Sequence, residues 1–344
     1  MSKAAELAAL IGSGQAQGNR NIIINGATQL WQRGTSVDTI ASGGYLCDRW
    51  RVAYAGTDGN VDVDQDTSVP TGQGFGYSQK VSMDASESSL DAGDQVNVTQ
   101  RIEAQNLQHL EFGTSSAKSL VVSFWVKSSV AATYSVEWVT PDGTERMIGR
   151  TYTINSANTW EYKTLNVPGD PSATINNDNG IGLDLRFWLD AGSSWTSGTF
   201  ATDWENTTQA NRVSATTGWL ISSNPTWHIT GIQLEIGDVS TPFEHEDFGT
   251  TLEKCRRYCQ VNPVHLGYNT GSQAVVSGSG TVQFTPIMRA TPTVTGTFSP
   301  QSGNAGTFAL ATTTSNNVHC YNSANNWSAS QGIFVNDFKA DAEL

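Results

Sequence analysis

The chain has 344 residues, enough for two domains or for one large β domain with appendages. Hydrophobic residues make up 38% and charged residues only 15%, below the roughly 25% of an average soluble domain. The net charge of −13 and 19 scattered basic residues argue against binding to nucleic acids or anionic membranes, because both need clustered Lys and Arg. No run of about 20 apolar residues is present, so we expect no membrane insertion.

The first predicted element is a short helix at residues 3–11. Leu7, Ala8 and Ile11 lie on one apolar stripe at helical spacing, and a Gly-rich connector follows to residue 18. Because a helix this short is unstable alone in water, we predict that 1–18 is an anchor that docks on sister copies or on a larger particle. The alternative is a frayed terminus. The segment does not resemble a signal peptide, so we expect a protein made in the cytosol that stays there or leaves by cell lysis.

From Asn21 onward the hydrophobic period changes to two, as in strands. Leu183, Leu185 and Phe187, for example, alternate with more polar neighbours. Strands that recur with turn clusters and no helices between them predict an antiparallel β sandwich, with one face of each sheet packed inward and the other in water. The predicted strands are 21–25, 50–55, 60–64, 77–83, 96–103, 120–127, 134–139, 146–154, 160–167, 182–190 and 229–236.

A second helix is predicted at 249–260, where it would connect two domains. Thr250 or Thr251 can cap it, and Asn262-Pro263 would stop it. The remaining chain is rich in Thr, Ser, Gly and Asn and predicts a smaller β domain with strands at 281–288, 292–299, 306–312 and 332–339. The predicted organisation is an anchor helix and linker (1–18), a sandwich domain (19–248), a connecting helix (249–262) and a C-terminal β domain (263–344).

The four cysteines give neither a disulfide framework nor metal-ligand spacing. Cys255 and Cys259 lie one helical turn apart, and we interpret them as reduced thiols packed against a neighbour. A two-ligand metal site is the alternative. We expect no cofactor.

Segments near both ends of the first domain carry a resemblance to a known family. They are NRNIIINGATQLWQRGTS with YLCDRWRV at the start, and WHITGIQLEIGDVSTPFEHEDFGTTLEKCRRYCQ at the end. Both resemble a group of proteins common among phage tail and structural genes. VNVTQRIEAQNL and SLVVSFWVKSS, between them, are similar to the central strands of galactose-binding-like carbohydrate modules, and FKADAEL resembles the last strand of phage fibre tip domains.

The resemblance covers roughly residues 19–260 and implies a jelly roll used in a bacteriophage tail or head fibre, commonly as a homotrimer. It implies a virion protein, assembled in the host cytoplasm, that contacts other virion proteins through its N-terminal segment. The outer partner would be a glycan or protein of the host cell surface, and the C-terminal β domain would form the exposed tip. Trp31 and Trp50, in the opening segment, are assigned to packing.

Tryptophans are the first candidate ligand-binding residues, because flat aromatic rings stack on the C–H faces of sugars. Trp125 and Trp188 lie on the strand faces opposite the apolar rows, and Trp195, Trp204 and Trp327 lie in polar segments that are typical of loops. The alternative is that these rings belong to the core or to a subunit interface.

An acidic run is the second candidate. Asp58, Asp62, Asp64 and Asp66 share one face if 58–66 is a strand, and carboxylate oxygens at that density could hold Ca²⁺. The run does not fit an EF-hand loop, because the sixth position counted from Asp62 lacks the required Gly. The favoured interpretation is a solvated outer face of the strand.

No catalytic motif is present: the sequence has no G-x-S-x-G, no H-E-x-x-H and no Gly-rich phosphate loop. We therefore expect a non-enzymatic fibre or appendage subunit for host attachment, with glycan binding as its means. One alternative is a polysaccharide-degrading fibre, although the sequence lacks the repeat that such enzymes commonly show. The other is a free carbohydrate-binding module.

Overall fold

The computed structural model describes residues 20–261, 264–267, 278–300, 308–322 and 332–344. The chain divides into two compact units, one that reaches to Asp247 and includes Leu344, and one from Phe248 to Glu343. The predicted anchor residues Leu7, Ala8 and Ile11 and the candidate site residue Trp327 lie outside the described residues.

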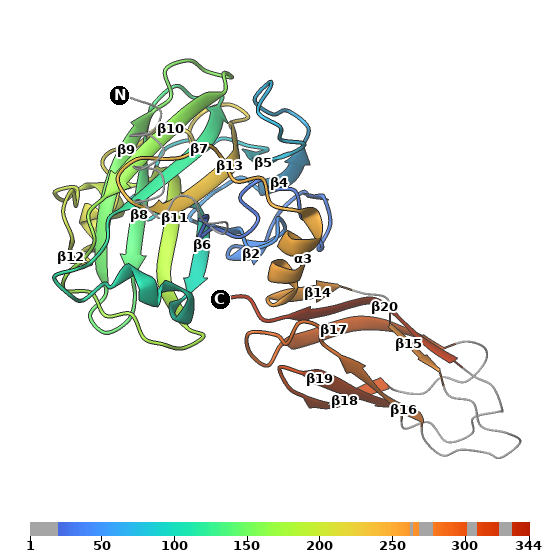
Figure 1. Ribbon diagram of the computed structural model, residues 1–344. Helices are drawn as coiled ribbons and strands as arrows, with labels where there is room; N and C mark the ends of the chain where they lie inside the picture. Colours follow the sequence, from blue (N-terminus) through green and yellow to red (C-terminus); the bar gives the residue numbers. More distant parts are fainter. Residues whose placement is uncertain (1–19, 262–263, 268–277, 301–307, 323–331) are drawn as a thin grey trace, which may run out of the picture. The chain divides into compact units, whose positions relative to one another are not determined.

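The first unit contains a six-stranded antiparallel sheet in the order β1-β4-β5-β13-β7-β10 (Figure 1). Its strands are β1 (Ser36–Val37), β4 (Val61–Asp66), β5 (Ser78–Met83), β13 (Thr226–Ile236), β7 (Leu120–Ser128) and β10 (Glu161–Val167). A bulge at Gly231 interrupts the pairing of β13 with β7, and the positive φ of 63° there is one that glycine adopts without strain.

A seven-stranded antiparallel sheet, in the order β12-β9-β8-β11-β6-β3-β2, forms the second layer. Its strands are β12 (Glu205–Asn206), β9 (Arg146–Thr153), β8 (Thr133–Thr140), β11 (Ile181–Ala191), β6 (Gln95–Glu103), β3 (Arg51–Ala55) and β2 (Gly44–Tyr45). Three short helices lie outside the sheets: η1 (Ala104–Leu110), α2 (Ser193–Thr196) and η2 (Gln209–Asn211).

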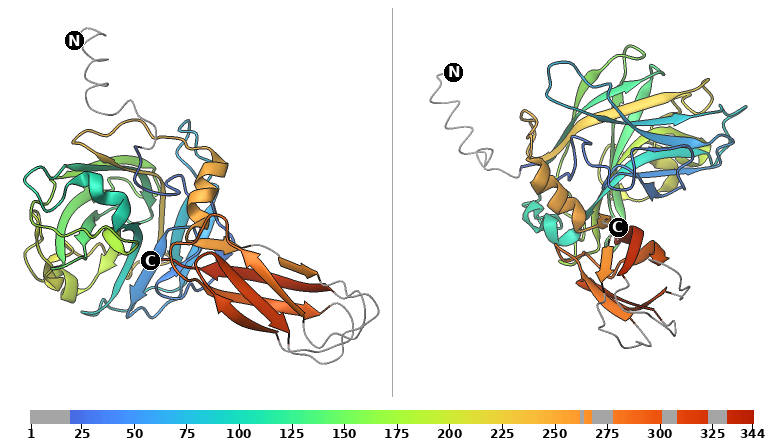
Figure 2. Two further views of the ribbon diagram at one scale, coloured as in Figure 1. Left: turned by 60° about the horizontal axis from the view of Figure 1, so that its bottom comes forward. Right: turned by 90° about the vertical axis from the view of Figure 1, so that its right-hand side faces the viewer.

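The two sheets pack face to face (Figures 1 and 2). One hydrophobic cluster joins the inward rows of both sheets, and the rings of Phe124 on β7 and Phe187 on β11 meet edge to face at 5.1 Å. Trp50 is fully buried and Trp31 nearly so, as their assignment to packing predicts. The predicted fold class, a mainly β jelly-roll sandwich followed by a smaller β unit, is confirmed.

The outer face of β11 is not in water, so the expectation of one wet face per sheet is wrong there. Asp184 and Trp188 point away from the main core, yet both are buried. Trp195 and Val213, in the long segment after β11, pack against Trp188, whereas Arg101 and Arg186 lie against Asp184. The alternation along the strand is genuine, but it separates two buried surfaces.

The predicted strand at 21–25 does not form, because side chains take the backbone groups that a ladder would use. The N–H of Ile24 donates to Oε1 of Gln100 at 2.8 Å, and the N–H of Ile23 donates to Oδ1 of Asn21 at 3.0 Å. Only Ile22 makes a sheet-like bond, from its N–H to the carbonyl of Leu234 at 2.9 Å. The segment bends across the molecule instead.

The second unit begins with α3 (Phe248–Arg256). The helix ends before the predicted residue 260 because the chain turns at Tyr258, whose N–H donates to the carbonyl of Cys255, and continues into a strand. In this division α3 is part of the second unit rather than a separate connector. Cys47, Cys255 and Cys259 are buried free cysteines.

Two small antiparallel sheets complete the second unit. One pairs β14 (Cys259–Val261), β15 (Val264–Gly267) and β17 (Thr293–Pro300) with β20 (Gly332–Asp341); the other has the order β16 (Gly278–Gln283), β19 (Asn317–Asn322), β18 (Phe308–Thr313). Phe284, Met288 and Phe338 belong to its core. β19 was not predicted, because its sequence NVHCYN has no clear alternation.

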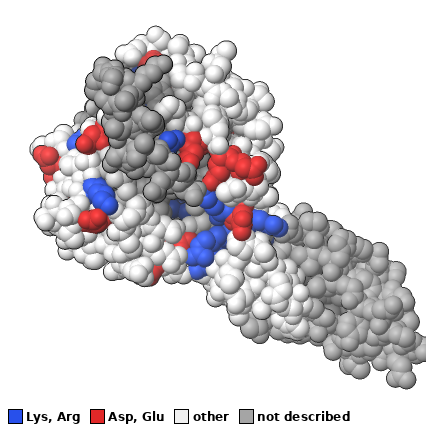
Figure 3. Space-filling model, in the orientation of Figure 1, with Lys and Arg blue, Asp and Glu red and all other residues white. Residues whose placement is uncertain are grey.

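The surface reflects the low charge content. On the face drawn in Figure 3, Lys, Arg, Asp and Glu lie in small groups separated by uncharged surface. None of the helices within the described ranges is long and apolar enough to span a membrane.

Candidate functional site

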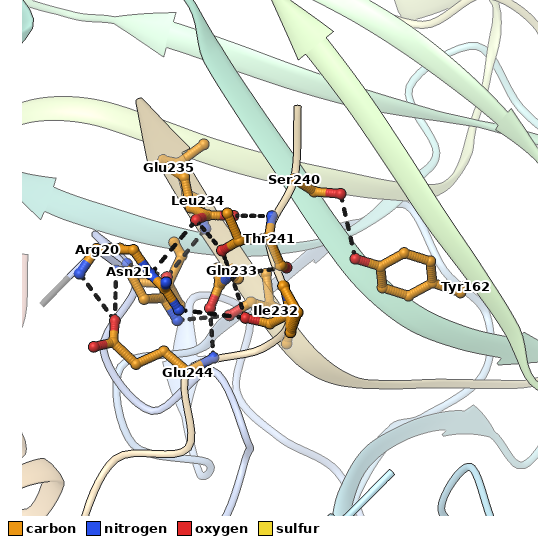
Figure 4. Close-up of polar contacts among 12 residues, drawn as sticks. Arg20, Asn21, Tyr162, Ile232, Gln233, Leu234, Glu235, Ser240, Thr241 and Glu244 are labelled. Carbon is orange, nitrogen blue, oxygen red and sulfur yellow. Dashed lines mark hydrogen bonds and ion pairs between the residues drawn. The ribbon is translucent and has the colours of Figure 1, made fainter. Parts of the chain in front are cut away.

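The closing segment of the first unit is fastened to its opening segment across β13 (Figure 4). Asn21 donates from Nδ2 to the carbonyl of Ile232 and accepts the N–H of Leu234 at Oδ1, both at 3.0 Å. Glu244 accepts the N–H groups of Arg20 and Asn21 at 2.9 and 3.2 Å. These contacts join residues more than 200 positions apart, so the opening and closing motifs meet in one unit.

Asn25 is the centre of the opening motif. Its buried amide donates to the carbonyls of Leu30 and Asp48, both at 3.0 Å, and accepts the N–H groups of Gln29 and Leu30. Its own carbonyl accepts the indole N–H of Trp50 at 3.1 Å. Buried amides with this many partners hold a fixed chain path. Asn21, Asn25 and Glu244 therefore hold the fold together.

An aromatic pair lies on the outer face of the six-stranded sheet. The register places Tyr162 of β10 opposite Trp125 of β7, and Trp125 opposite Thr230 of β13. Trp125 is half-buried, Tyr162 is 44% exposed, and their ring centroids lie 5.3 Å apart. Both rings stand on the side opposite the core row of Phe124, so together they offer an apolar surface to solvent.

A polar row lies beside this aromatic pair on the same face. Lys127 of β7 faces His228 of β13, which in turn faces Lys80 of β5. The Lys127 ammonium lies 5.3 Å from the ring centroid of Trp160 and donates to Oγ of Ser68 at 2.7 Å. Hydrogen-bond donors and aromatic rings are thereby held within two neighbouring rows of one rigid sheet.

His228 is the most perturbed group of this face. Burial, with the nearby positive charge of Lys127 as a second cause, lowers the pKa of its imidazole to about 4. Its Nε2 lies 3.4 Å from Oδ2 of Asp66, while its buried Nδ1 has no hydrogen-bond partner among the described residues. At neutral pH the imidazole is uncharged, with one ring nitrogen as donor and the other as acceptor.

The carboxylate of Asp66 has a lowered pKa. Partial burial, the largest single cause, acts in the opposite direction, but it is outweighed by three lowering causes together: the N–H of Ser68, which donates to Oδ1 at 2.6 Å, and the neighbouring His228 and Lys127. Asp66 is therefore ionised at neutral pH, and the face carries both acceptors and donors.

The closing segment also positions the exposed aromatic ring. Ser240 Oγ accepts a long hydrogen bond from the Tyr162 hydroxyl at 3.5 Å (Figure 4) and lies 3.4 Å from Oγ1 of Thr164. Thr241 anchors this segment through its N–H and hydroxyl, which both donate to Glu235 of β13. The segment thus borders the aromatic pair, and β13 holds it in place.

The structure does not bring the five candidate tryptophans together. Trp188 is only 1% exposed: its indole N–H donates to Glu137 at 3.1 Å, and Trp195 covers it at a centroid distance of 5.2 Å. The expectation that Trp188 is a platform for a ligand is therefore wrong, because the segment that follows β11 folds back over its ring. Trp195 is half-buried in the same cluster, beneath the guanidinium of Arg212.

Trp204 holds a loop in place. Its indole N–H donates to the carbonyl of Pro168 at 2.7 Å, and its ring meets Phe112 edge to face at 5.8 Å. Like Trp188, it lies on the side of the seven-stranded sheet, beside β12. Of the predicted site tryptophans, Trp125 alone among those described lies on the outer face of the six-stranded sheet.

The acidic run lies along β4, and two of its carboxylates already have hydrogen-bond donors. Asp62, Asp64 and Asp66 do share the outer face of β4, and exposed Asp58 precedes the strand. Asp64, however, accepts hydrogen bonds from Ser36 and Lys80, and Asp66 from Ser68. In the part of the chain that the structure describes, no three His, Cys, Asp or Glu side chains converge as a metal site requires. The solvated outer face, partly neutralised by Lys80, is what the structure contains.

Sequence reasoning missed Tyr162, Trp160, Lys127 and His228. The strand that carries Tyr162 was predicted, and its alternation already placed Tyr162 opposite the inward-facing Leu165. The sequence pattern does not show that β10 pairs with β7, or in which register, because more than 30 residues separate the two strands. The pairing with Trp125 therefore gave no local signal.

No protein-family model matches the sequence, and no curated protein matches it either. Among solved structures, the chain is similar to the enzymatically active domain of tailspike protein 4 of bacteriophage CBA120, at 17% identity and a TM-score of 0.35. That match covers 63% of this chain and 22% of the tailspike chain, so this chain spans less than a quarter of the tailspike's length.

Two carbohydrate-binding domains are also similar. A carbohydrate-binding module solved with β-1,4-galactotriose matches at 11% identity and a TM-score of 0.31, over 64% of this chain and 100% of the module. The N-terminal cellulose-binding domain of β-1,4-glucanase C from Cellulomonas fimi matches at 14% identity and a TM-score of 0.30, over 60% of this chain and 97% of that domain.

Proposed function

We propose that this protein binds a neutral glycan on the outer face of its six-stranded sheet, as a non-enzymatic attachment subunit of a bacteriophage tail or head fibre. One observation carries the glycan-binding part: Trp125 and Tyr162 form a solvent-facing aromatic pair beside a row of fixed polar side chains. The fibre assignment draws its support from the opening and closing motifs, which resemble those of phage structural proteins.

The face has the two components that sugar recognition needs. The C–H face of a pyranose stacks on the rings of Trp125 and Tyr162, and its hydroxyls exchange hydrogen bonds with Lys127 and Asp66. Because the strands fix these side chains before binding, little conformational entropy is lost. A single open face of this kind binds weakly, and the repetition of sites in a homotrimer raises the strength of attachment through avidity.

A glycan array with the purified protein tests the binding site. We expect binding to one class of neutral glycan, and Trp125→Ala or Tyr162→Ala should weaken it by at least about tenfold, or about 1.4 kcal/mol. Phe248→Ala, which removes a 55% exposed ring from α3 of the second unit, is the matched control and should bind like the wild type. Equal affinity of all four proteins would refute the assignment of the face.

A reducing-sugar release assay on the bound glycan separates binding from cleavage. Release of reducing sugar in proportion to the protein concentration would favour the polysaccharide-degrading fibre. A reducing-sugar level that stays constant with time supports attachment without cleavage. Size-exclusion chromatography with light scattering addresses the remaining alternative. A stable monomer would favour a free carbohydrate-binding module, and a trimer supports the fibre.

A further inference from the structure

A row of polar side chains crosses the outer face of the six-stranded sheet from β7 to β1. The register sets Lys127 of β7 opposite His228 of β13, and His228 opposite Lys80 of β5. Lys80 is in turn opposite Asp64 of β4, and Asp64 is opposite Ser36 of β1. One residue from each of five neighbouring strands therefore lies on a single line across the sheet.

The aromatic pair stands at one end of this row. Trp125 precedes Lys127 by two residues on the same face of β7, and Tyr162 of β10 is opposite Trp125. Neighbouring strands are about 4.8 Å apart, so the four strand-to-strand steps from β10 to β4 span about 19 Å. The row therefore extends well beyond the area that a single sugar ring covers when it stacks on the aromatic pair.

The far end of the row is open to solvent, and its charges are paired with each other. Nζ of Lys80 donates to Oδ2 of Asp64 at 3.1 Å, and the hydroxyl of Ser36 donates to Oδ1 at 2.6 Å. The side chains of Lys80 and Asp64 are each 26% exposed, and Ser36 is exposed. An ammonium group has three donors and a carboxylate can accept about four hydrogen bonds, so both groups keep capacity for a ligand. They suit sugar hydroxyls, which both donate and accept.

Further carboxylates surround this far end. Burial raises the pKa of Asp62, and the negative charges of Asp84 and Asp38 add to the effect. A sugar that carries a carboxylate or sulfate group would be repelled by these charges. The surroundings of the row therefore favour neutral sugar residues.

The middle of the row joins its two ends. His228 is only 5% exposed, so the flanking Lys127 and Lys80, rather than the imidazole, offer hydrogen-bond donors to a ligand there. Lys127 is held by Oγ of Ser68 at 2.7 Å, and Lys80 is held by Asp64. Fixed donors therefore continue from the aromatic pair to the far end.

We propose that the glycan is an extended chain of neutral sugar residues that lies across the strands, with a distal binding position at Lys80, Asp64 and Ser36. The inference rests on the proposed binding of a glycan at Trp125 and Tyr162, to which it adds this second position. A short glycan contacts only the aromatic pair, whereas a longer chain also exchanges hydrogen bonds with the distal residues. Affinity should therefore increase with chain length until the row is filled.

Calorimetric titration of the full-length protein with oligosaccharides of increasing length tests the distal position. The probes are neutral homo-oligosaccharides of glucose, mannose, galactose and N-acetylglucosamine, from disaccharide to hexasaccharide. In at least one series the affinity should rise by about tenfold or more from the disaccharide to the hexasaccharide. Lys80→Gln and Asp64→Asn should each remove most of that gain and leave disaccharide binding unchanged. Both variants should fold, because a partly exposed ion pair contributes little to stability.

Two further variants separate the distal position from the aromatic pair. Trp125→Ala should weaken the binding of the disaccharide and of the hexasaccharide alike. Lys118→Gln, which breaks an exposed ion pair with Glu111 outside the row, is the matched control and should bind every probe like the wild type. If circular dichroism shows that either Lys80→Gln or Asp64→Asn does not fold, the other variant decides.

The outcomes distinguish this inference from the proposed function. Equal affinity of the wild type for the disaccharide and the hexasaccharide would overturn the distal position and leave the aromatic pair as the glycan site. The same conclusion follows if Lys80→Gln and Asp64→Asn bind the hexasaccharide like the wild type, or weaken both probes equally. Failure of the wild type to bind any probe would overturn the proposed function and, with it, the distal position.

Discussion

Protonation of His228 should make the stability of the first unit depend on pH in a defined window. The imidazole is 5% exposed, lies between Lys127 and Lys80 in the sheet register, and has a pKa of about 4. In the unfolded chain its pKa returns to about 6.5. Between these values the unfolded chain binds a proton that the folded chain does not.

The sign and size follow from this difference. Stability rises with pH wherever the unfolded state binds more protons, so it should be complete above pH 6.5 and fall as the pH drops towards 4. One proton contributes about 1.4 kcal/mol per pH unit, so about 3 kcal/mol should be lost across the window, and nothing further below it. Loss of this size is large for a domain whose total stability is of the order of 5–15 kcal/mol.

Urea unfolding of the wild type and of His228→Gln, at half-unit steps from pH 7.5 to 3.5, measures the effect. Glutamine cannot be protonated, so the difference in unfolding free energy between the two proteins should change by about 3 kcal/mol across the window. Proton NMR of the imidazole should give a folded-state midpoint near pH 4.

His245→Gln is the control, because this histidine lies in the exposed closing segment rather than within the sheet. Its unfolding free energy should follow that of the wild type across the same pH range. Parallel curves for the wild type and His228→Gln would show that the folded and unfolded states bind the His228 proton equally, and the reasoning from burial would then fail.

Two further predictions concern the buried carboxylate of Glu137 and the acidic face of β4. Glu137→Ala should destabilise the protein by about 3–5 kcal/mol in urea unfolding, because two arginines and an indole N–H lose their shared buried partner. Glu145 is exposed, so the control variant Glu145→Ala should change the free energy of unfolding by less than about 0.5 kcal/mol. Calcium or EDTA at millimolar concentration should leave the melting temperature unchanged, because Ser36, Lys80 and Ser68 occupy the acidic face; a rise with calcium alone would show that the carboxylates rearrange into a metal site.

The sequence by itself determined the class of fold and most of the strands of the first unit. The alternation in 120–127, 182–190 and 229–236 indicates strands because side chains on a strand point to opposite faces with period two, whatever the neighbouring strands are. The pattern could not show what covers each face, and so Trp188 was assigned to the surface although a later segment buries it.

The candidate sites depended on the tertiary structure. Trp125 was identified from its strand face, but its partner Tyr162 and the neighbouring His228 come from strands that the chain reaches only after long connections. Asp64 and Lys127 are likewise 63 positions apart in the sequence, but the six-stranded sheet places them in one row with Lys80 and His228. Local spacing fixes which face a side chain occupies, whereas strand order and register decide its neighbours. These are set by the packing of the whole sandwich, which no single segment encodes.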